Sequence, residues 1–410
     1  MIRLAEIQVI LVLLVAISSP STAQSLEAVD QWIAEALANN AALGAQKSSI
    51  EVARAGVDSS DTWADPVFKY GIAPETLAGP NTVGHRFELS QQLPWPDQLS
   101  ASRKAAEAEV IAARQDTQWR VRQLTASVKG AYAQWWFANE AIELHHETRA
   151  LVEQLAKVSD QRLSYGVGSQ SQMLRVQTEL DTLDARLVEL KADQARLAGK
   201  LIPLLGRRPT DSNLQLSLPP DTPLVSNGRN GMDHPMIEAA QAREAEARAR
   251  LEIAETNRRP AFTASAGYNS LWADDSKRWM IGIGIRIPFS GQRQHSAVRK
   301  AAAEVSQHQW RTTQAHREWL ASIADMKASV QAGYDRLDIL NQRHLPNQRA
   351  HWEASLNELA SGTGRLEDAI NSARQLNGVK LARAAIIRDL YSARAGYEAL
   401  LPMDTTDVSN

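Results

Sequence analysis

The segment Trp279–Ile287, W-M-I-G-I-G-I-R-I, alternates large apolar residues with small or polar ones and ends at Pro288. This period-two alternation, with isoleucine at four positions of one parity, predicts a β-strand with one apolar face. Such a face packs against a core in a soluble sheet. In an outer-membrane barrel it meets lipid, while the opposite face lines an aqueous lumen. Other features of the sequence are needed to distinguish a soluble sheet from an outer-membrane barrel.

The composition excludes several classes of protein. The 410 residues carry a formal net charge of −2, so binding to nucleic acid has no electrostatic support. The chain has no cysteine, which excludes disulfides, thiolate metal sites and a lipidated N-terminal cysteine.

The N-terminal residues 1–23 have the features of a cleaved signal peptide. Arg3 supplies positive charge, Ile7–Ile17 is an apolar run too short to span a membrane, and Ser21–Ala23 fits a small-x-small cleavage site. A short membrane anchor is the alternative. No later segment has 18 consecutive apolar residues, so an exported chain of this kind could enter a membrane only as a barrel.

The sequence is internally duplicated, which is the most informative observation. Five short segments recur in the same order: Asn40–Leu43 with His234–Ile237, Pro66–Phe68 with Pro260–Phe262 and Leu93–Trp95 with Ile287–Phe289, each 194 residues apart, then Arg103–Ala106 with Arg299–Ala302 and Gly166–Gly168 with Gly362–Gly364, each 196 apart. We therefore expect two repeats at 24–210 and 222–402, with a two-residue insertion between Pro288 and Arg299. A linker at 211–221, containing a short strand at 213–218, separates the repeats, and a tail at 403–410 follows them.

Each repeat is predicted to contain a helix, two strands and a long helical hairpin. We expect first helices at about 26–61 and 236–257, strands at 67–73, 85–93, 261–269 and 279–287, and long helices at 97–164, 169–205, 293–360 and 365–400. Leucines spaced as a heptad in 169–205 indicate a coiled coil. Pro346 should kink the helix that contains it. A helix of about 65 residues reaches on the order of 100 Å, which is too long for one globular core.

The four predicted strands raise a problem of closure. Strands of about nine residues match a tilted bilayer crossing, but four of them cannot close a barrel, and an open edge is not viable in lipid. If these strands lie in a membrane, the chain must oligomerise. Three chains would supply twelve strands.

The duplicated order of these elements resembles the TolC-type outer-membrane efflux proteins over essentially the whole mature chain. The segments L-P-W-P-D-Q-L from Leu93 and I-P-F-S-G-Q-R from Ile287 are most similar to the CzcC-like cation-efflux branch. The resemblance implies a mostly α fold with a β-barrel portion: a homotrimer with a 12-stranded outer-membrane β-barrel and an α-barrel of long antiparallel coiled-coil helices. It further implies a periplasmic adaptor and an inner-membrane pump, which we expect to be proton-driven.

The resemblance also assigns candidate residues at the helical turns. The glycines at Gly166, Gly168, Gly362 and Gly364 would lie at periplasmic tips where the adaptor docks. The alternative is that they only permit the backbone of a helix–helix turn. The candidates for a pore constriction just beyond the turns are Gln172, Arg365, Glu367 and Asp368, of which Asp368 would form a cation-attracting ring in a trimer. The alternative for these is an ordinary solvated helix surface.

The strand parity separates two further sets of candidates. Lys69, Arg86, Glu88 and Arg286 would line a barrel lumen. The expected lipid contacts are on the other parity: Phe87, Leu89, Phe262, Tyr268, Trp279, Ile281, Ile283 and Ile285. None of the nine histidines has a metal-ligand spacing, and the chain has no G-x-S-x-G, P-loop or H-E-x-x-H motif. We therefore expect neither a metal site, a cofactor nor enzymatic activity.

These observations favour a passive exit duct of a tripartite efflux system that carries heavy-metal cations or drugs across the outer membrane. Two alternatives stay open. One is the exit duct of a type I protein-secretion system. The other is a soluble periplasmic coiled-coil scaffold in which the four strands form a small sheet.

Overall fold

The computed structural model describes residues 21–73, 83–207, 234–272, 274–288 and 291–401. The predicted signal peptide up to residue 20, the linker at 211–221 with its short strand, and the tail at 403–410 lie outside the described residues. The chain forms two compact units. The strand unit comprises the described residues of 42–120 and 230–320, and the helical unit those of 1–41, 121–229 and 321–401. Each unit therefore draws elements from both sequence repeats.

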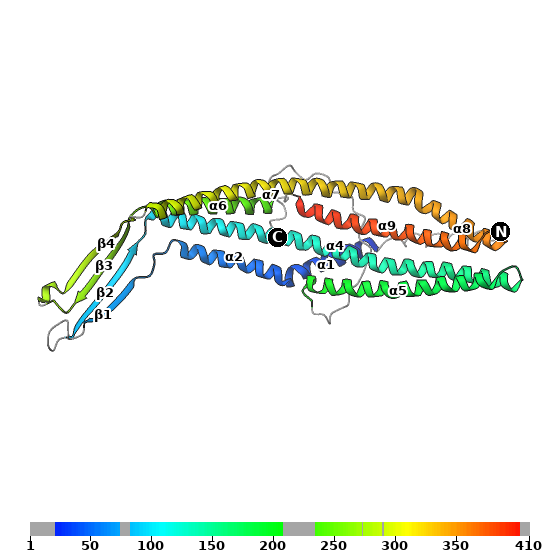
Figure 1. Ribbon diagram of the computed structural model, residues 1–410, viewed down its shortest axis with the longest axis horizontal. Helices are drawn as coiled ribbons and strands as arrows, with labels where there is room; N and C mark the ends of the chain where they lie inside the picture. The colour runs from blue at the N-terminus through cyan, green and yellow to red at the C-terminus, as the bar shows by residue number, and fades with distance from the viewer. Residues whose placement is uncertain (1–20, 74–82, 208–233, 273, 289–290, 402–410) are drawn as a thin grey trace, which may run out of the picture. The chain divides into compact units, whose positions relative to one another are not determined.

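Four strands in the strand unit form one antiparallel sheet in the order β1-β2-β3-β4 (Figure 1). They are β1 (Val67–Ala73), β2 (Gly84–Leu93), β3 (Ala261–Asn269) and β4 (Trp279–Arg286). A short 3₁₀ helix, η1 (Asp275–Lys277), lies between β3 and β4. The strands lie where the alternation predicts them. β1 and β4 each pair on one side only, so both edges of the sheet are open in the single chain.

The helices of the strand unit pack through small side chains. They are α2 (Ala41–Ser60), α6 (Pro235–Thr256), and the N-terminal parts of α4 (Pro96–Ser164) and α7 (Gly291–Ile339). Alanines of α4 and α6 are buried, among them Ala101, Ala108, Ala247 and Ala249. Because alanine costs little side-chain entropy and lets helix backbones approach, this composition favours long, closely spaced helices.

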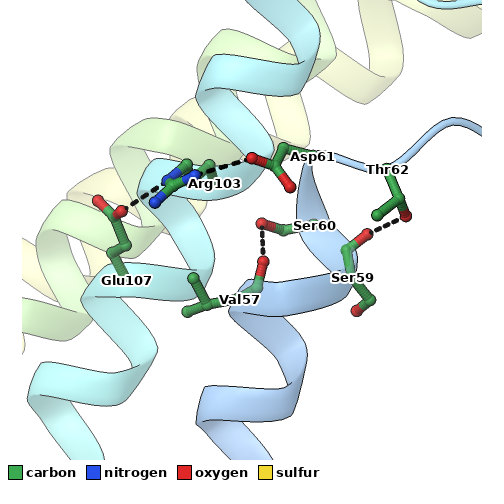
Figure 2. A network of polar contacts seen from close by, with 7 residues as sticks. All are labelled: Val57, Ser59, Ser60, Asp61, Thr62, Arg103 and Glu107. Carbon is green, nitrogen blue, oxygen red and sulfur yellow. Dashed lines mark hydrogen bonds and ion pairs between the residues drawn. The ribbon is translucent and has the colours of Figure 1, made fainter.

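The C-terminal end of α2 is fixed by polar contacts, which Figure 2 shows. The Arg103 guanidinium of α4 lies 2.8 Å from Asp61 Oδ2 and 2.9 Å from Glu107 Oε1. The Ser60 and Thr62 hydroxyls donate to backbone carbonyls three residues earlier, at 2.7 and 2.8 Å. The two hydroxyls satisfy carbonyls that the end of a helix leaves without an intrahelical partner. Together, these contacts hold the segment that leads from α2 into β1.

The helical unit contains α1 (Ser21–Asn39), α5 (Gln170–Leu205), α8 (Leu345–Ser361), α9 (Leu366–Leu400) and the C-terminal parts of α4 and α7. Its main core joins α4, α5, α8 and α9, and includes Val152, Leu155, Val176, Leu180, Leu183, Trp352, Leu359, Leu366, Ile370 and Leu376. The heptad leucines at the two ends of the α5 seam are buried, whereas those in its middle are half-buried. Among the described residues, no helix combines the length and apolarity that a membrane crossing requires.

The prediction of one helix over 26–61 is wrong, because the helix breaks at Asn40. The Asn40 side-chain amide donates to the Leu204 carbonyl at 3.1 Å, and Gly206 lies so close that an added Cβ would be 2.5 Å from the Asn39 carbonyl oxygen. These contacts end α1. The new helix α2 starts at Ala41, as α6 starts after its N-cap His234. The recurrence of Asn40–Leu43 at His234–Ile237 thus marks equivalent helix starts.

The position of the two-residue insertion also needs correction. Val67 pairs with Ser90 in the first hairpin, and its equivalent Ala261 pairs with Arg286 in the second. Val67 and Ala261 are 194 residues apart, whereas Ser90 and Arg286 are 196 apart. The extra residues therefore lie within the β3–β4 hairpin, not between Pro288 and Arg299. The loops between the last paired residues, Ala73 and Gly84 in the first hairpin and Tyr268 and Trp279 in the second, are equally long, so the extra residues lengthen each paired strand by one. Because one residue is added to each strand, cross-strand partners still share a face.

The predicted disturbance at Pro346 takes the form of a π-helical segment. The residues Leu340–His344 form η2, between α7 and α8, and Pro346 lies in the first turn of α8. Proline has no amide hydrogen and crowds the preceding turn, so an ordinary α-helical bond cannot form there. The wider π-turn accommodates the proline while the helix continues.

Candidate functional site

The two glycine turns of the helical unit have the same backbone geometry. In the first, Gly166 N–H donates to Leu163 O at 3.0 Å and Gly168 N–H donates to Arg162 O at 2.9 Å. In the second, Gly362 N–H donates to Leu359 O at 3.2 Å and Gly364 N–H donates to the Glu358 carbonyl at 2.8 Å. Donors and acceptors are each 196 residues apart, so the repeats coincide bond by bond at these turns.

Each glycine is required for a distinct reason. Gly166 and Gly362 have φ angles of 75° and 88°, in the left-handed region that favours glycine. A Cβ on Gly168 would lie 2.8 Å from Leu163 N, and one on Gly364 would lie 2.9 Å from Leu359 N. The turn geometry therefore accounts for all four glycines, and adaptor docking stays a prediction that needs its own evidence.

The helices that leave the two turns begin differently. Ser169 and Gln172 form a capping box at the start of α5: Gln172 N–H donates to Ser169 Oγ at 3.3 Å, and Ser169 N–H donates to Gln172 Oε1 at 3.3 Å. In α9 the N-cap position is Arg365, whose side chain makes no capping bond. The Gln172 side chain is thus committed to its own helix, whereas the first turn of α9 carries charged groups.

Those charged groups connect α9 to α5. Glu367 forms ion pairs with Arg365 on its own element and with Arg175 on α5. Hydrogen bonding to Arg365, together with the charges of Arg365 and Arg175, lowers the pKa of the Glu367 carboxyl. Asp368 is exposed and makes no ion pair or side-chain hydrogen bond within the described part of the chain. Of the four constriction candidates, Arg365 and Glu367 form an ion pair, whereas neither Gln172 nor Asp368 forms an ion pair or side-chain hydrogen bond with them.

A second ion pair between α5 and α9 lies deeper in the helical unit. Arg374 binds both carboxylate oxygens of Glu179, whose side chain is 6% exposed, and Arg374 Nε lies 2.7 Å from Glu179 Oε1. Arg162 Nη1 on α4 also donates to the Leu359 carbonyl of α8, at 2.5 Å. These contacts hold the two helical hairpins side by side.

Sequence reasoning did not identify Arg162, Arg175, Glu179 or Arg374. A signal for two of the contacts was present. Arg175 and Glu367 are 192 residues apart, and Glu179 and Arg374 are 195 apart, both close to the repeat offset. Opposite charges near that offset indicate that equivalent helices of the two repeats are neighbours.

The sheet of the strand unit has one apolar face that is open to the surroundings. Its cross-strand pairs include Phe87 with Tyr268, Phe262 with Ile285, and Ala266 with Ile281. Paired residues share a face, so the eight residues predicted as lipid contacts lie on one side of the sheet. Ile281 is 90% exposed in the single chain. Exposure is also high at Trp279, Ile283, Ile285 and Leu89, whereas Phe262 and Tyr268 are half-buried.

The other face carries the four residues predicted to line a lumen. Glu88 lies between two bases, with its oxygens 3.5 Å from Lys69 Nζ and 2.9 Å from Arg86 Nη2. Arg286 lies apart from this cluster, opposite Ala261 at the helix-proximal end of the sheet. A shallow hollow of about 350 Å³ on the sheet is lined by Arg86, Glu88 and the glycines Gly267, Gly282 and Gly284, among others.

The remaining titratable groups do not form a metal centre among the described residues, where no cluster of three or more His, Cys, Asp or Glu side chains has suitable geometry. His145 is buried on α4, and its Nε2 lies 3.2 Å from the Leu183 carbonyl of α5. Burial lowers the pKa of His145, and the bond to the carbonyl partly opposes this. The side chain thus has a structural partner and does not face an open site.

Two kinds of comparison agree on the class of protein. A family model described as "Outer membrane efflux protein" matches residues 32–207 and 232–401. The outer-membrane channel OprN has the same fold, with a TM-score of 0.80 at 19% identity, covering 93% of this chain and 92% of that one. The outer membrane protein VceC of Vibrio cholerae matches with a TM-score of 0.78 at 18% identity (94% and 100% covered), and CusC with 0.76 at 16% identity (95% and 96% covered).

One curated relative is similar in sequence. Protein CyaE of Bordetella pertussis is 28% identical over 251 residues, which are 57% of this chain and 52% of CyaE. The chain thus spans about half the length of the curated relative it matches.

Duplicated helical hairpins joined to an open four-stranded sheet define the class of TolC-like channel folds. Since the family model covers most of the sequence, the chain belongs to the outer membrane efflux protein family.

Proposed function

We propose that the chain is the outer-membrane exit duct of a tripartite efflux system, through which an inner-membrane pump expels its substrate by way of a periplasmic adaptor. The observation that carries this proposal is the open sheet. Its apolar face exposes large side chains, up to 90% for Ile281, and its two edge strands lack partners. Soluble monomers rarely expose a continuous apolar surface of this kind.

Membrane insertion as an oligomer accounts for both features. Three copies would supply twelve strands and close the sheet into a barrel, which leaves no edge in lipid. The apolar face would then meet lipid, and the face with Lys69, Arg86, Glu88 and Arg286 would line the lumen. The cleaved signal peptide would deliver the chain to the periplasm for insertion into the outer membrane.

The helical hairpins would extend this duct into the periplasm. The turns at Gly166–Gly168 and Gly362–Gly364 would form the periplasmic end, where an adaptor docks. Asp368 is the strongest constriction candidate, because it is exposed and unpaired in the single chain. Three copies around an axis would attract cations. The duct has no energy source in this proposal, so a pump, which we expect to be proton-driven, must supply it; heavy-metal cations and drugs are the expected cargo.

Membrane extraction and conductance test this function directly. We expect release from membranes only with detergent, a heat-sensitive trimer band in SDS, and ion conductance in planar bilayers. Release by high salt alone, without trimers, would refute the duct and favour a soluble scaffold. A deletion strain that becomes sensitive to metals or drugs would support efflux, whereas loss of one secreted protein with unchanged sensitivity would assign the duct to type I secretion.

A further inference from the structure

Within one chain, α4 of the first repeat contacts α6 of the second, and the turn that follows α6, through matched polar pairs. Lys104 Nζ lies 3.1 Å from Glu252 Oε2. Further along, Asp97 Oδ2 lies 2.5 Å from Arg259 Nη1. Between these two ion pairs, Gln98 Nε2 donates to Asn257 Oδ1 at 3.2 Å. All these residues belong to the strand unit, so this interface is defined by one compact body.

The duplication provides a second version of each surface. The α4 residues have equivalents on α7, 196 positions later, and their partners on or just after α6 have equivalents on or just after α2, 194 positions earlier. The equivalents of the pair Lys104 and Glu252 are Lys300 and Asp58. The pair Asp97 and Arg259 corresponds to Arg293 and Asp65. The pair Gln98 and Asn257 corresponds to Gln294 and Trp63.

Both ionic pairs keep their charge complementarity. Lys300 and Asp58 preserve the signs of the original pair. Arg293 and Asp65 exchange the signs of Asp97 and Arg259 at both positions, so a base still faces an acid. A change at one position alone would have placed like charges together, which is unfavourable. A fourth pair, Asp116 with Arg243, has the uncharged equivalents Thr312 and Ser49, which are not repulsive.

These equivalent residues do not meet within the chain. Asp58, Asp65 and Arg293 are exposed and form no ion pair within the described part of the chain. Lys300 makes only a 3.7 Å contact to Glu304 on its own helix.

The polar pair between them is also incomplete. Gln294 Oε1 is buried without a hydrogen-bond partner among the described residues. Its counterpart Trp63 is 57% exposed, and an indole N–H is a donor. Gln294 Oε1 thus lacks a donor, and the exposed indole N–H of Trp63 is a suitable one.

We infer that α7 of one copy docks against α2 and the segment before β1 of a second copy of this chain. Lys300 would pair with the second copy's Asp58 and Arg293 with its Asp65, while Gln294 Oε1 would accept from the indole of its Trp63. The inference rests on the oligomer proposed above. Such an interface joins two different surfaces, so it closes into a ring only when the rotation between copies permits.

The ion pairs would set the register between copies more than the strength of the interface. Exposed pairs of this kind contribute little stability, whereas complementary charges suppress wrong alignments. Asp61, about one turn after Asp58, already forms the intrachain contact with Arg103 of α4 that Figure 2 shows. Asp58 lines an open groove between α2 and α4 and is exposed, so it stays accessible to a second copy.

Thiol cross-linking tests the inference in the full-length protein, because the chain has no cysteine of its own. We would combine Lys300→Cys with Asp58→Cys, treat the membrane-inserted protein with a short bis-maleimide, and resolve it on denaturing gels. A bifunctional reagent is needed because residues joined by a long ion pair lie too far apart for a disulfide. We expect covalent dimers and trimers. The matched control, Lys104→Cys with Glu252→Cys, should cross-link within one chain and leave the monomer mass unchanged.

Charge reversal provides an independent measurement. Arg293→Asp should lower the temperature at which the trimer dissociates, and Arg293→Asp combined with Asp65→Arg should restore it. Trimers that form normally but show neither cross-linking nor this rescue would overturn the interface and leave the exit duct standing. Failure to form any trimer, in the unmodified protein as well, would instead refute the proposed function.

Discussion

Removing Arg374 should loosen the contact between α5 and α9 more than removing its partner does. The Glu179 side chain is 6% exposed, whereas that of Arg374 is 55% exposed. Arg374→Met leaves a carboxylate among the apolar residues of the helical core. Glu179→Met instead leaves a guanidinium that water can reach. The pair is therefore asymmetric, and the asymmetry has a predictable size.

The magnitude follows from the burial of the two partners. Breaking a fully buried pair costs about 3–5 kcal/mol, and because one end of this pair is solvated we reduce the estimate for Arg374→Met to about 1–3 kcal/mol. Glu179→Met should cost less than about 1 kcal/mol, as for an exposed pair. The double variant should resemble Glu179→Met, because no unpaired buried charge is left.

Amide hydrogen exchange on the detergent-solubilised protein measures this difference locally. At about 1.4 kcal/mol per tenfold change, Arg374→Met should accelerate exchange in α5 residues 176–183 by about 10- to 100-fold. Residues 42–60 of α2, in the other unit, serve as the internal control and should not change. Equal effects of the two single variants, or no effect of Arg374→Met, would show that the contact does not stabilise the helical hairpins.

Three further experiments, on five variants, test other parts of the structure. Gly364→Ala should destabilise its turn, because the new Cβ would lie 2.9 Å from backbone atoms. Gly378→Ala, where an added Cβ would have no atom within 4 Å, should instead stabilise α9 by about 0.5–1 kcal/mol. Hydrogen exchange of the α9 amides measures both effects. Burial lowers the pKa of His145 from 6.5, so the stability linked to its neutral form is fully present above pH 6.5 and is lost as the pH falls below that value. The dissociation temperature of the proposed trimer should therefore depend less on pH between 7.5 and 5.5 in His145→Gln than in the unmodified protein. Equal dependence in the two proteins would contradict this. Trp95→Phe removes the 2.9 Å hydrogen bond from the indole N–H to Pro260 O and should cost about 1 kcal/mol, seen as a lower dissociation temperature; Trp310→Phe, at a 71% exposed position, is its control.

The strands and turns could be predicted because their causes are local. Alternation of side chains defines β4 without knowledge of its neighbours, and Gly362 marks a turn because the backbone there has a positive φ. The break at Asn40 could not be predicted in this way, since it depends on a hydrogen bond to Leu204, 164 residues away. The recurrence of Asn40–Leu43 contained the information, but only a comparison of helix starts between repeats reveals it.

The contacts of the charged residues near the turns also depend on residues that are distant in the sequence. Arg365 and Glu367 could be identified from their distance to the glycines, but Arg175 could not, because its role depends on which helix lies beside α9. The sequence around Arg175 therefore does not reveal its contact with Glu367. Pairing is a property of the tertiary arrangement, and the repeat offset is the only part of it that the sequence records.

The edge strand β4 connects the proposed barrel to the proposed interface. Soluble proteins protect exposed strand edges with charges or proline, yet Trp279–Ile285 contains neither, and its first charge is Arg286. An edge of this composition is suited to pairing with another chain. α7 follows β4 after a short connection and carries Arg293 and Lys300 on its exposed surface. A second copy that extends the sheet at β4 would thus bring its α2 toward these two bases, because β1 follows α2 as directly as α7 follows β4. One neighbour can therefore complete both the sheet edge and the ion pairs, and an interface that satisfied only one of them would leave the other exposed.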